Sequence, residues 1–151
     1  MRIHESIAIN RLPDEVWAFL TDFFNSPRVR PGTLALRRTS PGPLGSGSVI
    51  QGRQMIVGFE TRLTMTVTEF DPPRRAVVTL AARPMRGAIS TTLEPTADGT
   101  RVDRTTDIEL HPALKLLSPV LGFIYLRQDR AASLNLKRLI EGTSPSAPQE
   151  P

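Results

Sequence analysis

Two charged residues lie on the faces of expected strands that should point inward, and they are the strongest candidates for a catalytic or binding role. Residues 3–9 alternate with the period of two that is typical of a half-buried strand, and Glu5 shares its face with isoleucines. Arg104 interrupts the apolar face of residues 101–110 in the same way. A buried charge is unfavourable unless it is paired. One reading is an anchor for a ligand carboxylate or hydroxyl, or an acid or base. The other is a structural Glu5–Arg104 pair, or an arginine that extends to solvent at the sheet edge.

Two further polar candidates, Gln128 and Asn135, lie on the stripe of a C-terminal helix that is expected to face the sheet. They would hydrogen-bond to a ligand or to ordered water in a cavity. The remaining candidates for the cavity wall are Trp17, Met65, Thr91, Ile124 and Tyr125. For the tryptophan and the methionine, packing in the core is the more common role.

Several kinds of site have no support in the sequence. The chain has no cysteine and only two histidines, His4 and His111, so a metal site would need carboxylates from elsewhere. No GxSxG segment marks a nucleophilic serine. The net charge of +4 comes from scattered arginines rather than from a basic run, which does not favour nucleic-acid binding. We therefore expect no metal, no cofactor and no nucleic-acid partner.

Length and composition indicate one globular unit. The chain has 151 residues, of which 39% are hydrophobic and 23% charged, as in ordinary globular proteins. The sequence contains no run of about 18 apolar residues that would predict a transmembrane helix, and its charged N-terminal segment does not fit a secretory signal. These features and the absence of cysteine predict a cytoplasmic protein with one domain at residues 1–142. The polar, proline-rich residues 143–151 are expected to form a disordered tail.

The elements that must position the candidate residues follow a clear order. After the strand at residues 3–9, a short helix begins near Pro13 with two carboxylates in its first turn. A second helical piece is expected at residues 22–25. Six segments of strand character follow, cut by proline- and glycine-rich turns, at residues 33–39, 49–57, 60–70, 76–82, 87–94 and 101–110. A helical turn or two at residues 113–117 precedes a long helix from Ser118 to about Glu141.

This order predicts an α+β fold. Successive strands that are linked by short turns must be largely antiparallel, which gives a sheet of about seven strands. The apolar face of the sheet needs a cover, and the C-terminal helix is the one large amphipathic element left to provide it. A curved sheet wrapped around one long helix leaves space between them, so we expect an internal cavity.

Five motifs in this order resemble those of a known superfamily. They are PDEVWAFLTDF at residues 13–23, GPLGSGS at 42–48, VTEFDPPRR at 67–75, DGTRV at 98–102 and NLKRLIE at 135–141. Together they are similar to the START-like (SRPBCC) superfamily, which includes the birch-pollen allergen and bacterial polyketide cyclase/dehydrase-like proteins. The resemblance implies the helix-grip fold. In that fold the first and last strands are neighbours, so Glu5 and Arg104 would be close enough to meet.

The resemblance implies function only broadly, because one scaffold serves lipid transport, hormone binding and cyclisation. We expect the cavity to bind an apolar small molecule such as a lipid, polyketide or isoprenoid, in a monomer or weak homodimer. One alternative is an aromatase/cyclase-type enzyme that moves a proton with a cavity residue. Another is a protein-interaction module with a filled cavity. The sequence matches no set of cavity residues that is typical of the enzymes in the superfamily, which favours binding over catalysis.

Overall fold

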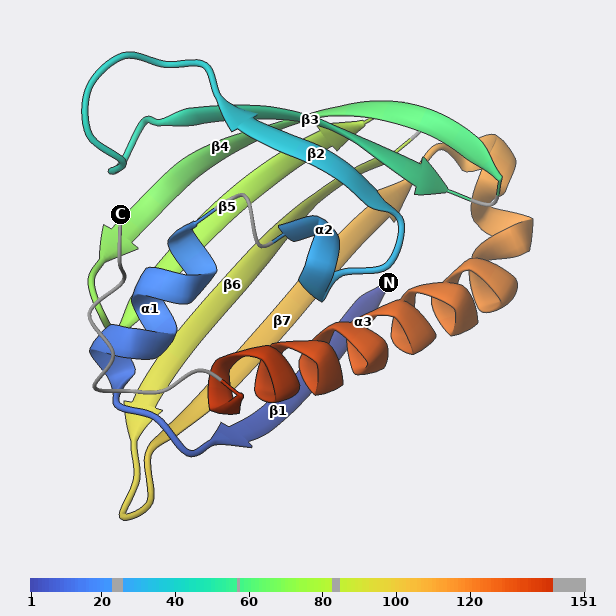
Figure 1. Cartoon of the computed structure of the whole chain (residues 1–151). Helices are drawn as coiled ribbons and strands as arrows, with labels where there is room; N and C mark the ends of the chain where they lie inside the picture. The colour runs from blue at the N-terminus through green and yellow to red at the C-terminus, as the bar shows by residue number, and fades with distance from the viewer. Residues whose placement is uncertain (23–25, 57, 83–84, 143–151) are drawn as a thin grey trace.

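The order of helices and strands agrees with the one predicted from the sequence. The computed structural model describes residues 1–22, 26–56, 58–82 and 85–142 (Figure 1). In chain order the elements are β1 (Arg2–Ile9), α1 (Pro13–Thr21), α2 (Ser26–Val29), β2 (Thr33–Arg38), β3 (Val49–Ile56), β4 (Phe59–Asp71), β5 (Arg75–Ala82), β6 (Met85–Pro95), β7 (Thr100–Leu110), the 3-10 helix η2 (Pro112–Leu117) and α3 (Ser118–Glu141). This is the predicted α+β arrangement.

The seven strands form one antiparallel sheet in the order β1-β7-β6-β5-β4-β3-β2. Consecutive strands are neighbours, as short turns require, except that β1 adds to the edge of β7. The register of that pair places Glu5 opposite Arg104, so the two residues share one face of the sheet. Register shifts on β2 and β4 are bulges, which bend the strands and increase the local twist. Figure 1 shows the resulting curvature of the sheet around the helices.

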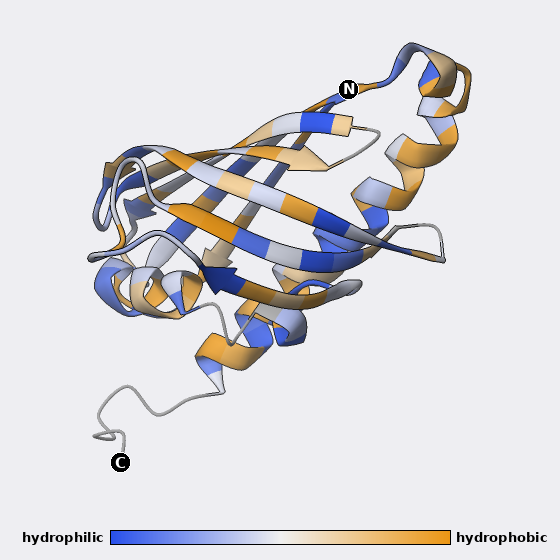
Figure 2. Cartoon of the chain, turned by 90° about the horizontal axis from the view of Figure 1, so that it is seen from above, coloured by the Kyte–Doolittle hydropathy of each residue, from blue (hydrophilic) through white to orange (hydrophobic). Residues whose placement is uncertain are grey.

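All three α-helices lie on the same face of the sheet (Figure 1). The long helix α3 contacts β1 at the sheet edge, α2 contacts both α3 and β2, and α1 contacts β6. The strands alternate between hydrophobic and hydrophilic residues along their length, which is the pattern of a sheet with one covered and one solvated face (Figure 2). The helices therefore cover the concave face of the sheet.

Proline begins two of these helices. Pro13 opens α1, where the absent N–H group would have no partner in the helix, and Asp14 and Glu15 complement the helix dipole. Pro119 lies in the first turn of α3, which ends before Gly142. The start of α1 and both limits of α3 were predicted from the sequence. Residues 143–151, which were predicted to be a disordered tail, lie outside the described part of the chain.

The second short helix was predicted too early in the sequence. The prediction placed it at residues 22–25, before Pro27, because proline usually ends a helix. In the structure Asp22 caps the end of α1, and α2 spans Ser26–Val29 with Pro27 in its first turn. Proline is tolerated there because an N–H group in the first turn donates no hydrogen bond within the helix. Residues 23–25 lie outside the described residues.

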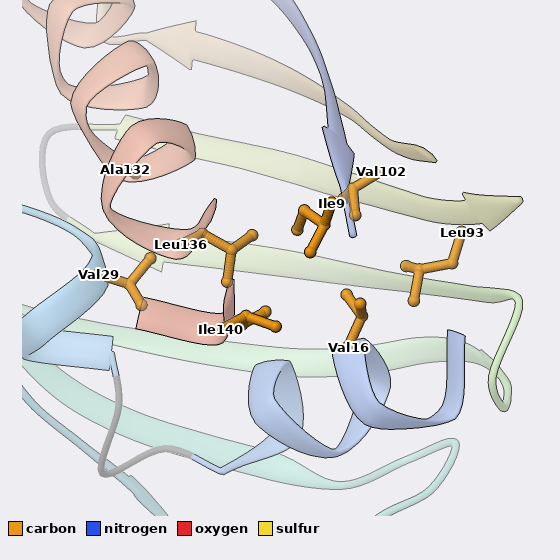
Figure 3. Close-up of a cluster of buried hydrophobic side chains, with 8 residues drawn as sticks. All are labelled: Ile9, Val16, Val29, Leu93, Val102, Ala132, Leu136 and Ile140. Atoms are coloured by element: carbon orange, nitrogen blue, oxygen red, sulfur yellow. The ribbon is translucent and has the colours of Figure 1, made fainter. Parts of the chain in front are cut away.

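The core closes one end of the space between helices and sheet. Its larger cluster joins α1, α2, α3 and the ends of β1, β6 and β7 (Figure 3), and it consists of Ile9, Val16, Val29, Leu93, Val102, Ala132, Leu136 and Ile140. A second cluster, toward the other end of the sheet, includes Ile3, Leu63, Met85, Ile108 and Tyr125. The long helix contributes to both clusters, so it is held at both ends of the sheet's concave face.

Candidate functional site: an internal cavity

A cavity of about 240 Å³ lies between the concave face of the sheet and the helices. Its wall on the sheet side is largely aliphatic and includes Ile50, Leu63, Met65, Val67, Val78 and Leu80. On the helix side, Trp17 of α1 and Tyr125 of α3 close it, and Trp17 packs against Phe70 with the ring centroids 5.5 Å apart. A cavity with apolar walls and a few polar groups is typical of a binding site for a small organic molecule.

One polar region of the cavity is an ion pair between α2 and α3. Arg30, which follows α2 and lines the cavity, donates a hydrogen bond through Nη1 to Oδ1 of Asp129. The Asp129 side chain is 2% exposed and that of Arg30 is 20% exposed. Removing a carboxylate from water is costly unless a positive charge and hydrogen bonds compensate. Arg30 supplies both, and the pair ties the short helix to the long one.

Arg104 on β7 is the second positive charge at the cavity. Its side chain is half-buried and lies deep in the protein. Because Arg104 lines the cavity, the exposed part of its side chain faces that space. Burial lowers the pKa of its guanidinium, and the nearby charge of Arg30 lowers it further, while Asp129 acts in the opposite direction. Arginine nevertheless stays charged in proteins. The buried Nε atom of Arg104 has no hydrogen-bond partner among the described residues.

Thr106 lies two residues after Arg104 on β7, and therefore on the same face of the strand. It also lines the cavity, and its side-chain oxygen is buried with no hydrogen-bond partner in the described ranges. Two neighbouring polar groups thus face the cavity with unused hydrogen-bonding capacity. A buried polar group without a partner costs about 1–3 kcal/mol, so the polar side of the cavity is incompletely satisfied at these two residues.

The phenol of Tyr125 is held in its neutral form. Its hydroxyl donates a hydrogen bond to Sδ of Met85 at 3.0 Å. Burial raises the pKa of Tyr125 to about 12, with smaller and opposing effects of Arg30 and Asp129. At neutral pH the phenol is therefore a hydrogen-bond donor and not a base. Because sulfur is a weak acceptor, a ligand oxygen would be a better partner for this hydroxyl.

Comparison with known proteins agrees with this architecture. Residues 1–141 match the family described as polyketide cyclase / dehydrase and lipid transport. The chain belongs to this family. The match covers nearly the whole sequence and confirms the resemblance to START-like proteins, a superfamily whose members generally bind hydrophobic ligands. Among curated proteins, no sequence matches this chain.

Solved structures of the same fold span almost the whole chain. The protein TTHA0849 from Thermus thermophilus superposes with a TM-score of 0.81 at 17% identity, over 95% of this chain and 99% of that one. A START superfamily protein from Mycobacterium smegmatis gives 0.75 at 13% identity, covering 91% and 98%. Ara h 8.0201 gives 0.73 at 11% identity, covering 95% and 99%. At these identities the likeness shows the fold alone, and the fold is the predicted helix-grip.

In this member of the polyketide cyclase / dehydrase and lipid transport family, the cavity brings together five of the nine residues proposed from the sequence. They are Trp17, Met65, Thr91, Arg104 and Tyr125. They come from α1, β4, β6, β7 and α3, so the fold gathers them from most of the length of the chain. That these five residues contact a ligand remains a proposal.

Glu5 does not line the cavity, contrary to the prediction. It lies opposite Arg104 in the sheet register, but its carboxylate points to Nε of Arg130 on α3, 3.7 Å away. The reason is the position of β1 at the sheet edge, where α3 covers its inner face. The predicted alternative of a Glu5–Arg104 ion pair is therefore also wrong, since Glu5 has its ion pair with the helix above it.

Ile124, Gln128 and Asn135 were expected on the inward stripe of the long helix, and none of them lines the cavity. The buried stripe is instead Tyr125, Asp129, Ala132, Leu136 and Ile140. Each predicted residue precedes one of these by one position, a rotation of about 100° around the helix axis. Asn135 accordingly faces α2, where its Nδ2 donates to the Val29 carbonyl at 3.1 Å, and Gln128 lies beside Gly32.

The histidines lie outside the cavity. The ring of His4 faces solvent on β1 and is 3.1 Å from the Thr105 hydroxyl, and His111 accepts a hydrogen bond from the Ala113 N–H at the start of η2. Within the described part of the chain, no three histidine or acidic side chains gather closely enough to hold a metal ion. In the same residues, no helix has the length and apolar character needed to cross a membrane.

A larger hollow of about 1540 Å³ lies between the ends of β6 and β7, η2 and the start of α3. Charged residues that are exposed to solvent line part of it, among them Arg86, Glu109 and Lys115. The lining of this hollow is more polar than that of the smaller cavity. The smaller cavity is therefore the candidate site, because it is apolar and contains buried polar groups.

The sequence reading missed Arg30 and Thr106, which line the cavity, and Asp129, which pairs with Arg30. It also missed the other polar residues of the wall: Thr21, Asp22, Thr33 and Gln54. One signal was present for Asp129. It stands four residues after Tyr125 and three before Ala132, so a charge occupies the middle of a helical stripe that continues through Leu136. Arg30 carries no comparable signal, because it follows a four-residue helix whose orientation the sequence does not determine.

Proposed function

We propose that this protein binds an apolar small molecule, such as a lipid, a polyketide or an isoprenoid-like compound, in the cavity beneath its helices. The observation that carries the proposal is the cavity of about 240 Å³, whose wall is largely aliphatic and carries a few polar groups from both the sheet and the helices. Binding sites for small organic molecules have this composition because apolar area supplies affinity and the polar groups fix orientation. The volume lies just below the usual range, which favours a small ligand over a two-chain lipid.

The chemistry of Tyr125, Arg104 and Asp129 supports binding over a cyclase-type reaction, and it leaves Asp22 as the carboxylate of the wall that a cyclase would have to use. A general base must lose its proton near neutral pH. Tyr125 retains its proton because burial raises its pKa to about 12, and Arg104 remains a cation. The carboxylate of Asp129 is engaged by Arg30. The open cavity also argues against the interaction module, which would have a filled interior.

We further propose that the protein acts in the cytoplasm, as a monomer or weak homodimer. The absence of cysteine from the sequence fits a reducing compartment.

The chain contains a direct probe of its own cavity. It has one tryptophan and one tyrosine, and both of these residues line the cavity. We expect decanol, farnesol and a naphthol to change the Trp17 fluorescence in a saturable way and to raise the melting temperature, since a ligand that binds the folded state stabilises it. Glucose, a polar molecule of similar size, should do neither. Absence of saturable binding for every apolar compound would overturn the proposal.

A second experiment addresses the natural ligand. Native mass spectrometry of the protein purified from its own host should reveal a co-purified mass that is released on denaturation. Identification of that mass would replace the general class with a compound. Its absence, together with a flat response to the compounds above, would count against a binding protein.

A further inference from the structure

The unpartnered groups of the cavity point to the kind of ligand it takes. Arg104 and Thr106 are neighbours on one face of β7, and both line the cavity. The Nε of Arg104 and the Oγ1 of Thr106 are buried, and no residue in the described ranges is hydrogen-bonded to either. A single unsatisfied atom is an ordinary imperfection of a fold. Two residues at successive inward positions of one strand, one of them a cation, each with an unsatisfied buried atom, call for an explanation.

The charges around Arg104 do not balance. Two charged residues act on its guanidinium, Arg30 and Asp129, and the carboxylate of Asp129 already accepts a hydrogen bond from Arg30. This group therefore contains two positive charges and one negative charge. Glu5, although opposite Arg104 in the register, pairs with Arg130. Asp22, the other charged residue of the wall, lies at the C-terminal end of α1 and is not among the charges that act on Arg104. Because Arg30 and Asp129 neutralise each other, Arg104 has no counter-ion of its own among the described residues.

We propose that Arg104 and Thr106 bind the carboxylate of an amphipathic ligand whose hydrocarbon part lies against the aliphatic wall of the cavity. The inference rests on the proposed function and narrows its ligand to a small, single-chain or ring-containing organic acid. A guanidinium matches a carboxylate in geometry and charge, and the threonine hydroxyl can donate to the same group. A carboxylate supplies the one missing negative charge. The cavity of about 240 Å³ has no room for the two acyl chains of a phospholipid.

The test compares two probes that differ only at the polar end, decanoic acid and decanol, with Trp17 fluorescence and calorimetry as readouts. We expect the wild-type protein to bind decanoate more tightly than decanol by about tenfold or more, the size of one charged hydrogen bond. Arg104→Met should remove this preference and leave decanol binding unchanged or improved. Thr106→Val, which keeps the shape of the side chain, should reduce the preference by a smaller factor.

Controls separate this inference from the proposed function. Arg37→Met makes the same change in net charge at an exposed position on β2 and should leave the preference intact. Arg104→Lys keeps the charge but not the two-point geometry, so it should retain part of the preference and replaces Arg104→Met if that variant does not fold. Equal affinity for the two probes, or a preference that survives Arg104→Met, would overturn the inference while the binding function stands. Failure of both probes to bind would overturn the two together.

Discussion

At the scale of single residues, Asp129 is the side chain on which the polar part of the cavity depends. Its carboxylate is 2% exposed, receives a hydrogen bond from Arg30 and also acts on Arg104. Without it, two guanidinium groups would face each other in a site that excludes most water. Like charges in such surroundings repel more strongly than they would in solvent. The acid therefore makes it possible for the fold to keep two arginines at one cavity.

The first prediction concerns this carboxylate. Asp129→Asn keeps the shape of the side chain but removes its charge, so Arg30 is left without a counter-ion near Arg104. Breaking a buried ion pair in this way typically costs about 3 kcal/mol or more. We expect the free energy of unfolding, measured by urea denaturation, to fall by about that amount.

The matched control is Asp107→Asn. Asp107 forms an ion pair with Arg2 at 2.7 Å, but both side chains are largely in solvent. Exposed pairs contribute little because water screens them. The control should therefore be nearly as stable as the wild type. Equal losses for the two variants would mean that the Asp129 pair is no more important than a surface pair.

At the scale of elements, the long helix shows how far the sequence could be read. Its limits and its amphipathic character were predictable, because proline and glycine mark its ends and apolar residues recur with helical spacing. The rotation of the helix about its axis could not be predicted. The stripes through Ile124 and through Tyr125 are similarly apolar. The stripe that is buried contains Asp129, and an aspartate is not expected in a buried position unless its partner is known. That partner, Arg30, is 99 residues away in the sequence.

The same limit applies to Glu5. The alternation of β1 correctly placed it on the inner face of the sheet, and the register does set it opposite Arg104. Whether an inward charge meets the cavity or a helix depends on which part of the sheet the helix covers. The sequence patterns of strands and helices do not contain this information, because it comes from long-range packing.

The second prediction tests the rotation of α3. Leu136 is 3% exposed and belongs to the larger core cluster, whereas Leu134 is 61% exposed. Leu136→Ala should lower the free energy of unfolding by about 2–5 kcal/mol, through lost burial and the cavity left behind. Leu134→Ala should change it by less than about 0.5 kcal/mol, since leucine and alanine have similar helix propensities. Thermal or urea denaturation measures both, and a larger loss for Leu134→Ala would contradict the assigned rotation.

The end of α3 is fixed by a charged group that titrates. The carboxylate of Glu141 accepts a hydrogen bond from the backbone N–H of Asn10 at 2.8 Å, and Lys137 lies 3.4 Å from it. The hydrogen bond from Asn10 lowers the pKa of Glu141 from its ordinary value of 4.5, against the opposing effect of burial and with help from Lys137. The helix end and the segment after β1 are thereby held together.

The third prediction follows from this shift. A group whose pKa is lowered by folding stabilises the protein above its ordinary pKa, and the effect is lost as the pH falls through the folded-state value. Glu141→Gln should therefore be less stable than the wild type at about pH 7, and the difference should shrink as the pH falls below the ordinary pKa of 4.5 and through the lower folded-state pKa. Urea denaturation at several pH values measures it. A difference that does not change with pH would show that the charge of Glu141 is not what holds the helix end.

At the scale of the whole molecule, the sheet and helices form a container around the cavity, with one core cluster toward each end of it. Such a container can lose its interior space without losing its fold, provided that the added atoms enter the cavity. Filling a well-packed core costs about 1–3 kcal/mol because side chains and backbone must move. Filling a cavity should cost less, since the atoms enter space that is already open.

The fourth prediction uses this difference to test the container directly. Ala76 lies on the inner face of β5, where it lines the cavity, whereas Thr79 on the same strand is exposed on the outer face. Ala76→Phe places a phenyl ring in the space that a ligand would occupy, and Thr79→Phe places the same ring on the outer face of the sheet. Calorimetric titration with decanol and decanoic acid should show loss of binding for Ala76→Phe and wild-type affinity for Thr79→Phe. Both variants should stay folded, with melting temperatures close to that of the wild type. If Ala76→Phe is folded and still binds both compounds, the ligand lies elsewhere, and the surface hollow beside η2 becomes the site to examine, because it is the larger of the two spaces.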